Sequence, residues 1–277
     1  MKTIIRYAGN KTRLLKYIVP HLPKDISSYT YVEPFIGSGA LFLHILPTKW
    51  IINDINKDLI NMYTTIRDDV SNLIKIMKHF DTSTNFTNLS NDDKLVVIRK
   101  YLQKMIKLPL NTKRAAYYII TKSSAFMAMT MIKDKYHIKG LDPNILKHNN
   151  LHFLSDKYFK LLKTLSTILQ SKDGRIFNLD YKKIISKSKP HYFYYFDCPY
   201  SEQDYEFSYN VEEAKHNFVE DLYQEVKKLD GKNIKWMMSQ ADSKIVRDRY
   251  KEYTIIEISV FRAISNQHKK ELLIKNY

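Results

Sequence analysis

Short strand-like segments alternate with helical ones over most of this chain, and this alternation limits the possible folds more than any other feature. The strand-like segments are apolar and rich in aromatic and β-branched residues, which favour strands. We expect strands at residues 29–35, 50–54, 176–179, 191–196, 234–239, 254–260 and 272–275. We expect helices between most of them, for instance at residues 12–21, 40–46, 158–170, 214–229 and 243–250. This order predicts an α/β fold with a doubly wound, mostly parallel sheet.

Two parts of the chain depart from this order. Residues 263–269, which link the last two expected strands, are too few for a parallel crossover, so a terminal antiparallel strand is expected. From residue 58 to about residue 128 no convincing strand occurs. Helical periodicity instead covers residues 59–80, 92–108 and 113–129, with a polar linker at residues 81–90.

These departures predict a sheet domain that is interrupted by a helical insertion. Residues 1–57 and 151–277 would form the sheet domain, and residues 58–150 would form the insertion. Residues 129–140 alternate loosely between polar and apolar side chains. They predict either a hairpin or a loop that becomes ordered on binding.

The charge balance favours a polyanionic partner. Lys and Arg number 45 against 29 Asp and Glu, which gives a net charge of +16. Neutralising phosphates with such a surplus releases counterions and drives association with nucleic acid. An AT-rich genome, which favours lysine codons, is the alternative explanation.

Cysteine usage and hydropathy narrow the class of protein further. The single cysteine excludes an internal disulfide framework and a multi-cysteine zinc site, and we expect no metal. Arg6 interrupts any secretory leader, and no apolar run is long enough to cross a membrane. We expect a soluble intracellular protein.

A glycine-rich turn follows the first expected strand. Gly37 and Gly39 lie in the segment 33–39, where missing side chains would let a ligand approach the backbone. Asp54 ends the next strand and could accept hydrogen bonds from ribose hydroxyls. Because Phe42 stands where a dinucleotide fold has a third glycine, a nucleoside cofactor without phosphates, such as S-adenosylmethionine, fits better. A turn needed only for tight packing is the alternative.

The segment 197–200 ends the most aromatic strand. Its Asp197 and the carbonyl of Cys198 could accept hydrogen bonds from an exocyclic amine, Pro199 would stiffen the turn, and Tyr200 could stack on a flipped base. The thiol of Cys198 allows a second chemistry, nucleophilic attack on a cytosine ring. An ordinary polar turn is the remaining alternative.

In these segments and in their order the chain resembles DNA adenine-N6 methyltransferases of the Dam type. Residues 7–11 resemble that family's first cofactor motif, residues 31–40 its glycine loop, residues 53–60 its ribose-binding segment, and residues 197–200 its catalytic Asp-Pro-Pro-Tyr. Residues 238–240 and 261–274 resemble its closing strands. The resemblance spans nearly the whole chain and implies a Rossmann-like methyltransferase domain with a helical target-recognition insertion.

The resemblance also implies roles for particular residues. The implied cofactor-binding residues are Tyr7, Ala8, Gly9, Lys11, Glu33, Pro34, Phe35, Gly37, Ser38, Gly39, Asp54, Ile55, Phe177, Asn178, Asp180 and Asp197. The implied catalytic residues are Asp197, Cys198, Pro199 and Tyr200. The candidate DNA contacts of the insertion are Lys104, Lys107, Lys113, Arg114, Lys122, Lys133, Lys135 and Lys139. Residues 129–140 would read the bases.

The expected reaction is transfer of a methyl group from S-adenosylmethionine to adenine in double-stranded DNA. A cognate restriction endonuclease is a possible partner, and the protein would act as a monomer or weak dimer. Cys198 replaces the family's usual proline or aliphatic residue, and residues 124–129 lack the polar groups of enzymes that read GATC. Three alternatives stay open: a cytosine-C5 methyltransferase using Cys198, an RNA or protein amine methyltransferase, and an inactive DNA-binding homologue.

Overall fold

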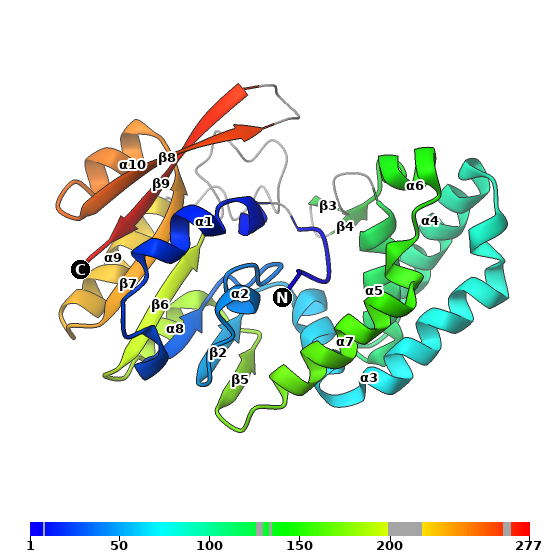
Figure 1. Cartoon of the computed structure of the whole chain (residues 1–277), viewed down its shortest axis with the longest axis horizontal. Helices are drawn as coiled ribbons and strands as arrows, with labels where there is room; N and C mark the ends of the chain where they lie inside the picture. The colour runs from blue at the N-terminus through cyan, green and yellow to red at the C-terminus, as the bar shows by residue number, and fades with distance from the viewer. Residues whose placement is uncertain (8, 126–129, 133–134, 199–217, 263–266) are drawn as a thin grey trace.

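A seven-stranded sheet organises one half of the molecule, and a group of helices forms the other (Figure 1). The computed structural model describes residues 1–277 except residues 8, 126–129, 133–134, 199–217 and 263–266. The strands of the sheet are β1 (Thr30–Glu33), β2 (Trp50–Asn53), β5 (Gly174–Phe177), β6 (Tyr192–Asp197), β7 (Lys235–Ala241), β8 (Thr254–Arg262) and β9 (Gln267–Lys275). Each of the seven expected strands is confirmed, with shifted ends.

The strand order is β5-β2-β1-β6-β7-β9-β8. The first five strands in this order are parallel, whereas β9 runs antiparallel to both β7 and β8. The doubly wound, mostly parallel sheet and its terminal antiparallel strand are therefore confirmed. From β1 the chain adds strands β2 and β5 on one side, and it then returns to add β6 and β7 on the other side of β1. In open α/β sheets, the carboxyl ends of the two strands at such a switch in strand order form the ligand-binding crevice.

The central strand β6 shows how the sheet is buried on both faces. Phe193 and Tyr195 belong to a hydrophobic cluster on one face, together with residues of the N-terminal segment. Tyr194 and Phe196 belong to a second cluster on the other face, together with residues of α8 (Tyr181–Ser186), α9 (Phe218–Asp230) and α10 (Lys244–Arg249). Successive strand residues point to opposite faces, which explains why this strand is apolar without interruption.

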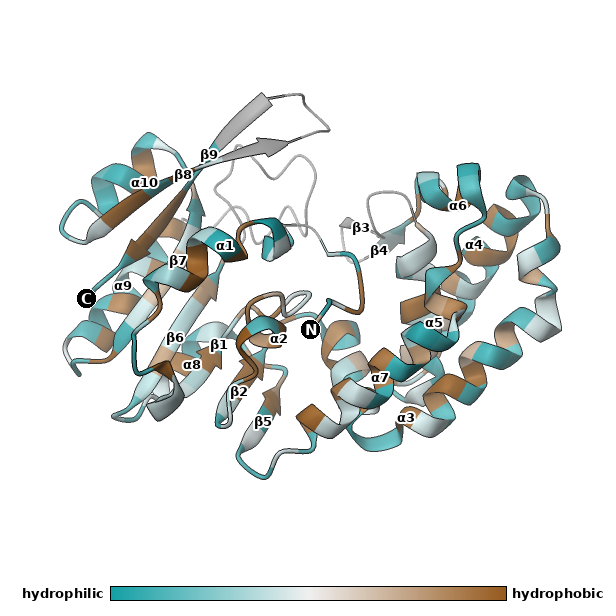
Figure 2. Ribbon diagram, viewed as in Figure 1, coloured by the Kyte–Doolittle hydropathy of each residue, from teal (hydrophilic) through white to brown (hydrophobic). Residues whose placement is uncertain are grey.

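The other half of the molecule consists mainly of helices. They are α3 (Lys57–Thr84), α4 (Asn91–Lys107), α5 (Thr112–Ser124), α6 (Pro143–His148) and α7 (Asp156–Leu169). Apolar residues recur along α5 and α7 (Figure 2), and α3 packs against both helices. The cluster that covers one face of the sheet continues into these helices, so the expected sheet domain and insertion share one core.

Residues within the expected 129–140 segment form a two-stranded antiparallel hairpin. Its strands are β3 (Thr130–Ile132) and β4 (Lys135–His137), so the structure supports the hairpin rather than an unstructured loop. The preceding helix α5 ends at Ser124, five residues before its expected end, because Ala125 has an extended backbone. No helix among the described residues is long and apolar enough to cross a membrane.

The expected helix at residues 12–21 is broken into three short pieces. They are two 3-10 turns, η1 (Lys11–Arg13) and η2 (Val19–His21), on either side of α1 (Leu15–Ile18). Pro20 lies in η2 and has no backbone N–H to donate. The expected helix at residues 40–46 is α2 (Phe42–Ile45), which ends where Leu46 adopts a left-handed conformation. The expected linker at residues 81–90 is shorter, because α3 continues to Thr84.

Candidate active site

Four segments distant in sequence meet at the carboxyl edge of the sheet. They are the N-terminal residues around Tyr7, the loop after β1, Asp54 after β2, and Asp197 at the end of β6. The contacts between them are direct, since the N–H of Gly37 donates to Oδ2 of Asp54 at 3.1 Å. The edge where ligands bind in such sheets therefore carries residues that the sequence singles out.

The loop after β1 requires glycine at two positions. Gly37 has φ +46°, and a Cβ added there would lie 3.1 Å from Cδ1 of Tyr7. Gly39 has φ +68°, and its added Cβ would lie 3.0 Å from the hydroxyl oxygen of Tyr63. That hydroxyl also donates to the carbonyl of Gly37 at 3.0 Å. The left-handed backbone and the close neighbours both disfavour larger residues at these two positions. The glycines therefore allow the backbone of the loop to pack closely against Tyr7 and Tyr63.

Asp54 is held by its neighbours in a fixed orientation. It is 8% exposed, and its Oδ1 accepts a hydrogen bond from the N–H of Asn56 at 2.9 Å. The side chain of Asn178 donates to the carbonyls of Asp54 and Ile55 at 2.8 and 3.0 Å. A carboxylate offers about four acceptor positions, so Asp54 can accept from a ligand as well as from the backbone.

The remaining predicted cofactor residues surround this loop. Ile55 is 56% exposed, which is unusual for an isoleucine at a sheet edge, and Phe177 is half-buried. Asn178 and Asp180 are exposed, and Asp180 caps α8 by accepting from the N–H of Lys182. Five of the predicted cofactor residues at the end of β1 and in the loop after it are buried: Glu33, Pro34, Gly37, Ser38 and Gly39.

Sequence reasoning overlooked Asn53, which ties three strand ends together. Its side-chain amide donates to the carbonyls of Pro34 and Leu179, both at 2.9 Å, and its Oδ1 accepts from the N–H of Leu179. These bonds fix the ends of β1, β2 and β5 relative to one another. An amide at the buried end of an apolar strand was the signal that could have revealed it.

Lys11 lies within reach of two carboxylates. Its Nζ is 2.7 Å from Oδ1 of Asp197 and 3.9 Å from Oε2 of Glu271, and it donates to the carbonyl of Gly9 at 3.0 Å. Burial raises the pKa of Asp197 above its ordinary value, the Lys11 charge opposes this rise, and the Glu271 charge adds to it. The sequence predicted Lys11 and Asp197 in this site but did not identify Glu271.

Glu33 contributes a further carboxyl group beneath the loop. It is 2% exposed and accepts a 2.7 Å hydrogen bond from the hydroxyl of Tyr31. Burial raises the pKa of Glu33 well above its usual range, and the Tyr31 hydrogen bond only partly offsets that effect. Burial of the Glu33 side chain and its hydrogen bond with Tyr31 suit a structural role beneath the loop.

Cys198 is 4% exposed, and burial raises the pKa of its thiol well above the usual value. Such a thiol resists forming the thiolate that nucleophilic attack requires, so the environment disfavours the cytosine-C5 alternative. Two predicted catalytic residues, Pro199 and Tyr200, lie outside the described residues, as does the predicted cofactor residue Ala8. Phe35 is half-buried, and its ring lies 5.2 Å from that of Tyr181.

Two predicted DNA contacts are at odds with the structure. Arg114 is 8% exposed, and both its Nε and Nη2 donate to the carboxylate of Asp58, at 2.5 and 3.0 Å. Lys122 is 1% exposed, and its Nζ lies 4.6 Å from the centre of the Tyr7 ring. Burial lowers the pKa of Lys122 to about 7. Both side chains point into the protein because their helix, α5, is enclosed by its neighbours, so neither is available to phosphates.

The other predicted DNA contacts occupy different positions. Lys104, Lys107, Lys113 and Lys139 are exposed. Lys135 belongs to β4, although its side chain is not described, and Lys133 lies outside the described residues.

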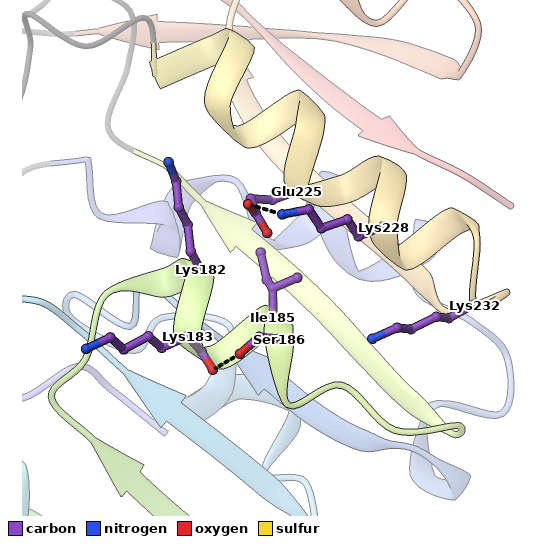
Figure 3. Close-up of a pocket in the computed structure, with 7 residues that line it drawn as sticks. All are labelled: Lys182, Lys183, Ile185, Ser186, Glu225, Lys228 and Lys232. Carbon is purple, nitrogen blue, oxygen red and sulfur yellow. Dashed lines mark hydrogen bonds and ion pairs between the residues drawn. The ribbon is translucent and has the colours of Figure 1, made fainter.

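A surface pocket of about 300 Å³ lies between α8 and α9 (Figure 3). Its lining includes four lysines, of which Lys182 pairs with Asp221 and Lys228 with Glu225. None of the predicted site residues lines it. The sheet edge, rather than this pocket, is therefore the candidate active site.

The sheet order, the glycine loop, Asp54 and Asp197 together define a Rossmann-like methyltransferase. A family model described as D12 class N6 adenine-specific DNA methyltransferase matches residues 7–264, and the chain belongs to this family. It is a site-specific DNA methyltransferase that acts on adenine.

Two of the similar proteins match this chain over its full length, and a third matches a shorter region. The Type II methyltransferase M1.LlaDCHI of Lactococcus lactis is 26% identical and is matched over 100% of this chain and 96% of its own length. The Type II methyltransferase M.MjaIII of Methanocaldococcus jannaschii is also 26% identical, over 100% and 99%. The DNA adenine methylase of Escherichia coli K12 is 39% identical over a shorter region, which covers 24% of this chain and 23% of the relative.

Proposed function

We propose that the chain methylates the N6 amino group of an adenine flipped out of double-stranded DNA, with S-adenosylmethionine as the methyl donor. The observation that carries this proposal is the position of Asp197 at the end of β6, beside the glycine loop that follows β1. A base must leave the duplex to reach such a recessed edge. Asp197 would then accept a hydrogen bond from the amino group of that base.

The residues at the edge fit S-adenosylmethionine. Gly37 leaves space that a Cβ would fill against Tyr7, Asp54 presents a fixed carboxylate suited to ribose hydroxyls, and Ile55 exposes an apolar surface suited to a purine. The remaining predicted cofactor residues, including Phe177, Asn178 and Asp180, would flank the same ligand. When bound, the donor would supply an electrophilic methyl group on a sulfonium.

The protein's own groups would act by holding the target amine. The two N–H groups of the amine would donate hydrogen bonds to Asp197 and to the carbonyl of Cys198. This would free the nitrogen lone pair from conjugation with the ring and leave it able to attack. Pro199 would stiffen this turn and Tyr200 would stack on the base. The methyl group would pass from the donor's sulfur to the amine nitrogen, and the proton that the methylated amine releases would go to water by way of the Asp197 carboxylate. No covalent enzyme intermediate is needed, and positioning supplies most of the rate.

The helical segment 58–150 would serve as the target-recognition domain, with the hairpin in residues 129–140 reading the bases. Exposed Lys104, Lys107, Lys113 and Lys139 support contact with phosphates, as does the net charge of +16. Arg114 and Lys122 are omitted, because they are buried.

The names of the similar proteins favour a role in restriction and modification of DNA. Two full-length relatives are named Type II methyltransferases, which supports a role beside a cognate restriction endonuclease. We propose that the protein works as a monomer or weak dimer, as a single site suffices for the transfer. Sedimentation of the protein with and without DNA tests this state.

The decisive experiment replaces Asp197 by alanine. Tritiated methyl transfer from S-adenosylmethionine is measured into whole-genome-amplified DNA, which carries no prior methylation, and into RNA and protein as controls. We expect label in DNA only, lost in Asp197→Ala while DNA binding persists. Sequencing that detects modified adenine then gives the target. Label in RNA or protein, or an active Asp197→Ala variant, contradicts the proposal.

A further inference from the structure

Lys11 is buried between two carboxylates that belong to different strands. Lys11 is 2% exposed and Glu271 is 6% exposed, so both lie in the protein interior. The Nζ of Lys11 is 2.7 Å from Asp197 on β6 and 3.9 Å from Glu271 on β9. The cation is thus closely paired with one carboxylate and within ion-pair range of the other.

The reversed strand β9 brings Glu271 to this place. Because β9 lies between β7 and β8, Glu271 pairs with Ala241 at the end of β7, while Ser239 of the same strand pairs with Asp197. Glu271 therefore lies at the same edge of the sheet as Asp197, two strands away. Its burial requires a compensating charge, which Lys11 supplies.

Binding of the target amine creates a conflict at Lys11. A carboxylate that is tightly paired with an ammonium is a weaker acceptor for a neutral amine, and one that turns to the amine leaves the ammonium less well compensated. A buried cation without compensation is strongly unfavourable. A second carboxylate within reach of the same cation removes this conflict.

We propose that Glu271 is a positioning residue for methyl transfer, which holds Lys11 while Asp197 engages the target amine. A movement of Nζ by about 1 Å would bring the 3.9 Å separation to the length of an ordinary charged hydrogen bond. This inference rests on the proposed role of Asp197 and extends it to a residue that does not touch the substrate.

The electrostatics of the edge give the proposal a measurable signature. Within the described part of the chain, the charged or titratable groups around Asp197 are Lys11, Glu271, Glu33, Tyr31, Tyr195 and Cys198. Among them the negative charge of Glu271 raises the pKa of Asp197. Removing that charge lowers this pKa, so the acid limb of the rate profile moves to lower pH.

The test compares Glu271→Gln with Glu271→Asp in the full-length protein. Methyl transfer to whole-genome-amplified DNA gives kcat between pH 5 and 9, and calorimetry gives the affinity for S-adenosylmethionine. For Glu271→Gln we expect kcat to fall about tenfold and the acid limb to move to lower pH, with cofactor affinity changed less than about twofold. Glu271→Asp keeps the charge and should keep the acid limb. Lys270→Gln, on the exposed neighbour, is the matched control.

Two results overturn the proposal. One is a Glu271→Gln variant with the kcat and acid limb of the unaltered protein. The other is a loss of activity that merely follows the folded fraction and is equal in Glu271→Gln and Glu271→Asp. If Glu271→Gln does not fold, Glu271→Ala, which also removes the charge, is measured in its place, and an unchanged kcat and acid limb in that variant overturn the proposal. An active Asp197→Ala variant would instead refute the proposed function itself, so the two failures are distinguishable.

Discussion

Tyr136 donates a 2.7 Å hydrogen bond to Oδ2 of Asp58, and this contact joins the hairpin to the first turn of α3. Asp58 also accepts both hydrogen bonds from Arg114 of α5. Asp54, the predicted ribose ligand, precedes α3 by only a few residues. The hairpin is therefore anchored beside the proposed cofactor site.

Arg114→Ala should destabilise the protein. It leaves the buried carboxylate of Asp58 without its cation, and breaking a buried pair in this way costs about 3–5 kcal/mol. Urea denaturation measures the change, with Lys113→Ala as the exposed neighbouring control, which should change stability by less than about 0.5 kcal/mol. Equal effects of the two substitutions would contradict the importance of the Asp58 pair.

Gly37→Ala should weaken binding of S-adenosylmethionine by about tenfold or more, which corresponds to about 1.4 kcal/mol. The added methyl group would lie 3.1 Å from Tyr7 on a backbone with φ +46°, so the loop or the ring must move. Calorimetric titration with S-adenosylmethionine measures the loss. Gly231→Ala is the control, because its added Cβ has only ordinary contacts and its φ is not left-handed. Unaltered affinity in Gly37→Ala would refute the assignment of this loop.

The free energy of unfolding should rise between about pH 7 and pH 10, because the buried Lys122 loses its unfavourable charge in the folded protein over this range. Its pKa is about 7 when folded and 10.5 when unfolded, so between these values the unfolded chain binds more protons. Stability rises with pH wherever that holds. Lys122→Met should remove this part of the rise and increase stability most at pH 7 and below. Urea denaturation of both proteins at pH 7 and 10 measures the difference. If the free energy of unfolding changes equally with pH in the two proteins, the pKa of Lys122 is not lowered by burial.

Cys198→Ser should retain methylation of adenine, because only the backbone carbonyl at this position is given a role. The thiol is buried and its pKa is raised, so a thiol reagent should react slowly with the folded protein and rapidly after denaturation. Loss of all methyl transfer in a variant that still binds cofactor and DNA would revive the nucleophilic alternative.

Lys113→Ala and Lys139→Ala should weaken DNA binding uniformly across sequences. Each removed phosphate contact should lower the slope of log affinity against log salt by about one. Fluorescence anisotropy at several salt concentrations measures the slopes. Lys232→Ala, in the surface pocket between α8 and α9, provides a charge-matched control that should leave the slope unchanged. Equal slopes for all three variants would remove these lysines from the proposed interface.

The sequence alone determined the strands, the parallel sheet and the segments that meet at its carboxyl edge. Strand periodicity and glycine turns are local properties, and topology places strand ends together, so Gly37, Asp54 and Asp197 could be predicted. Cys198 was singled out for its carbonyl from its place at the end of the same strand as Asp197, and Lys11 followed from the resemblance. The expected start of β9 was five residues late, because its first five residues, 267–271, are all polar and lack the apolar pattern that marks a strand.

Only the tertiary structure decided which charged side chains face water. Arg114 and Lys122 read as surface cations, since charge and spacing do not reveal that α5 is buried from Arg114 to Ser124. Glu271 lay one residue before the expected last strand and had no predicted role, and the insertion of β9 between β7 and β8 brings it to Lys11. Burial and charge pairing depend on packing between distant segments, whereas helix, strand and turn signals lie in consecutive residues.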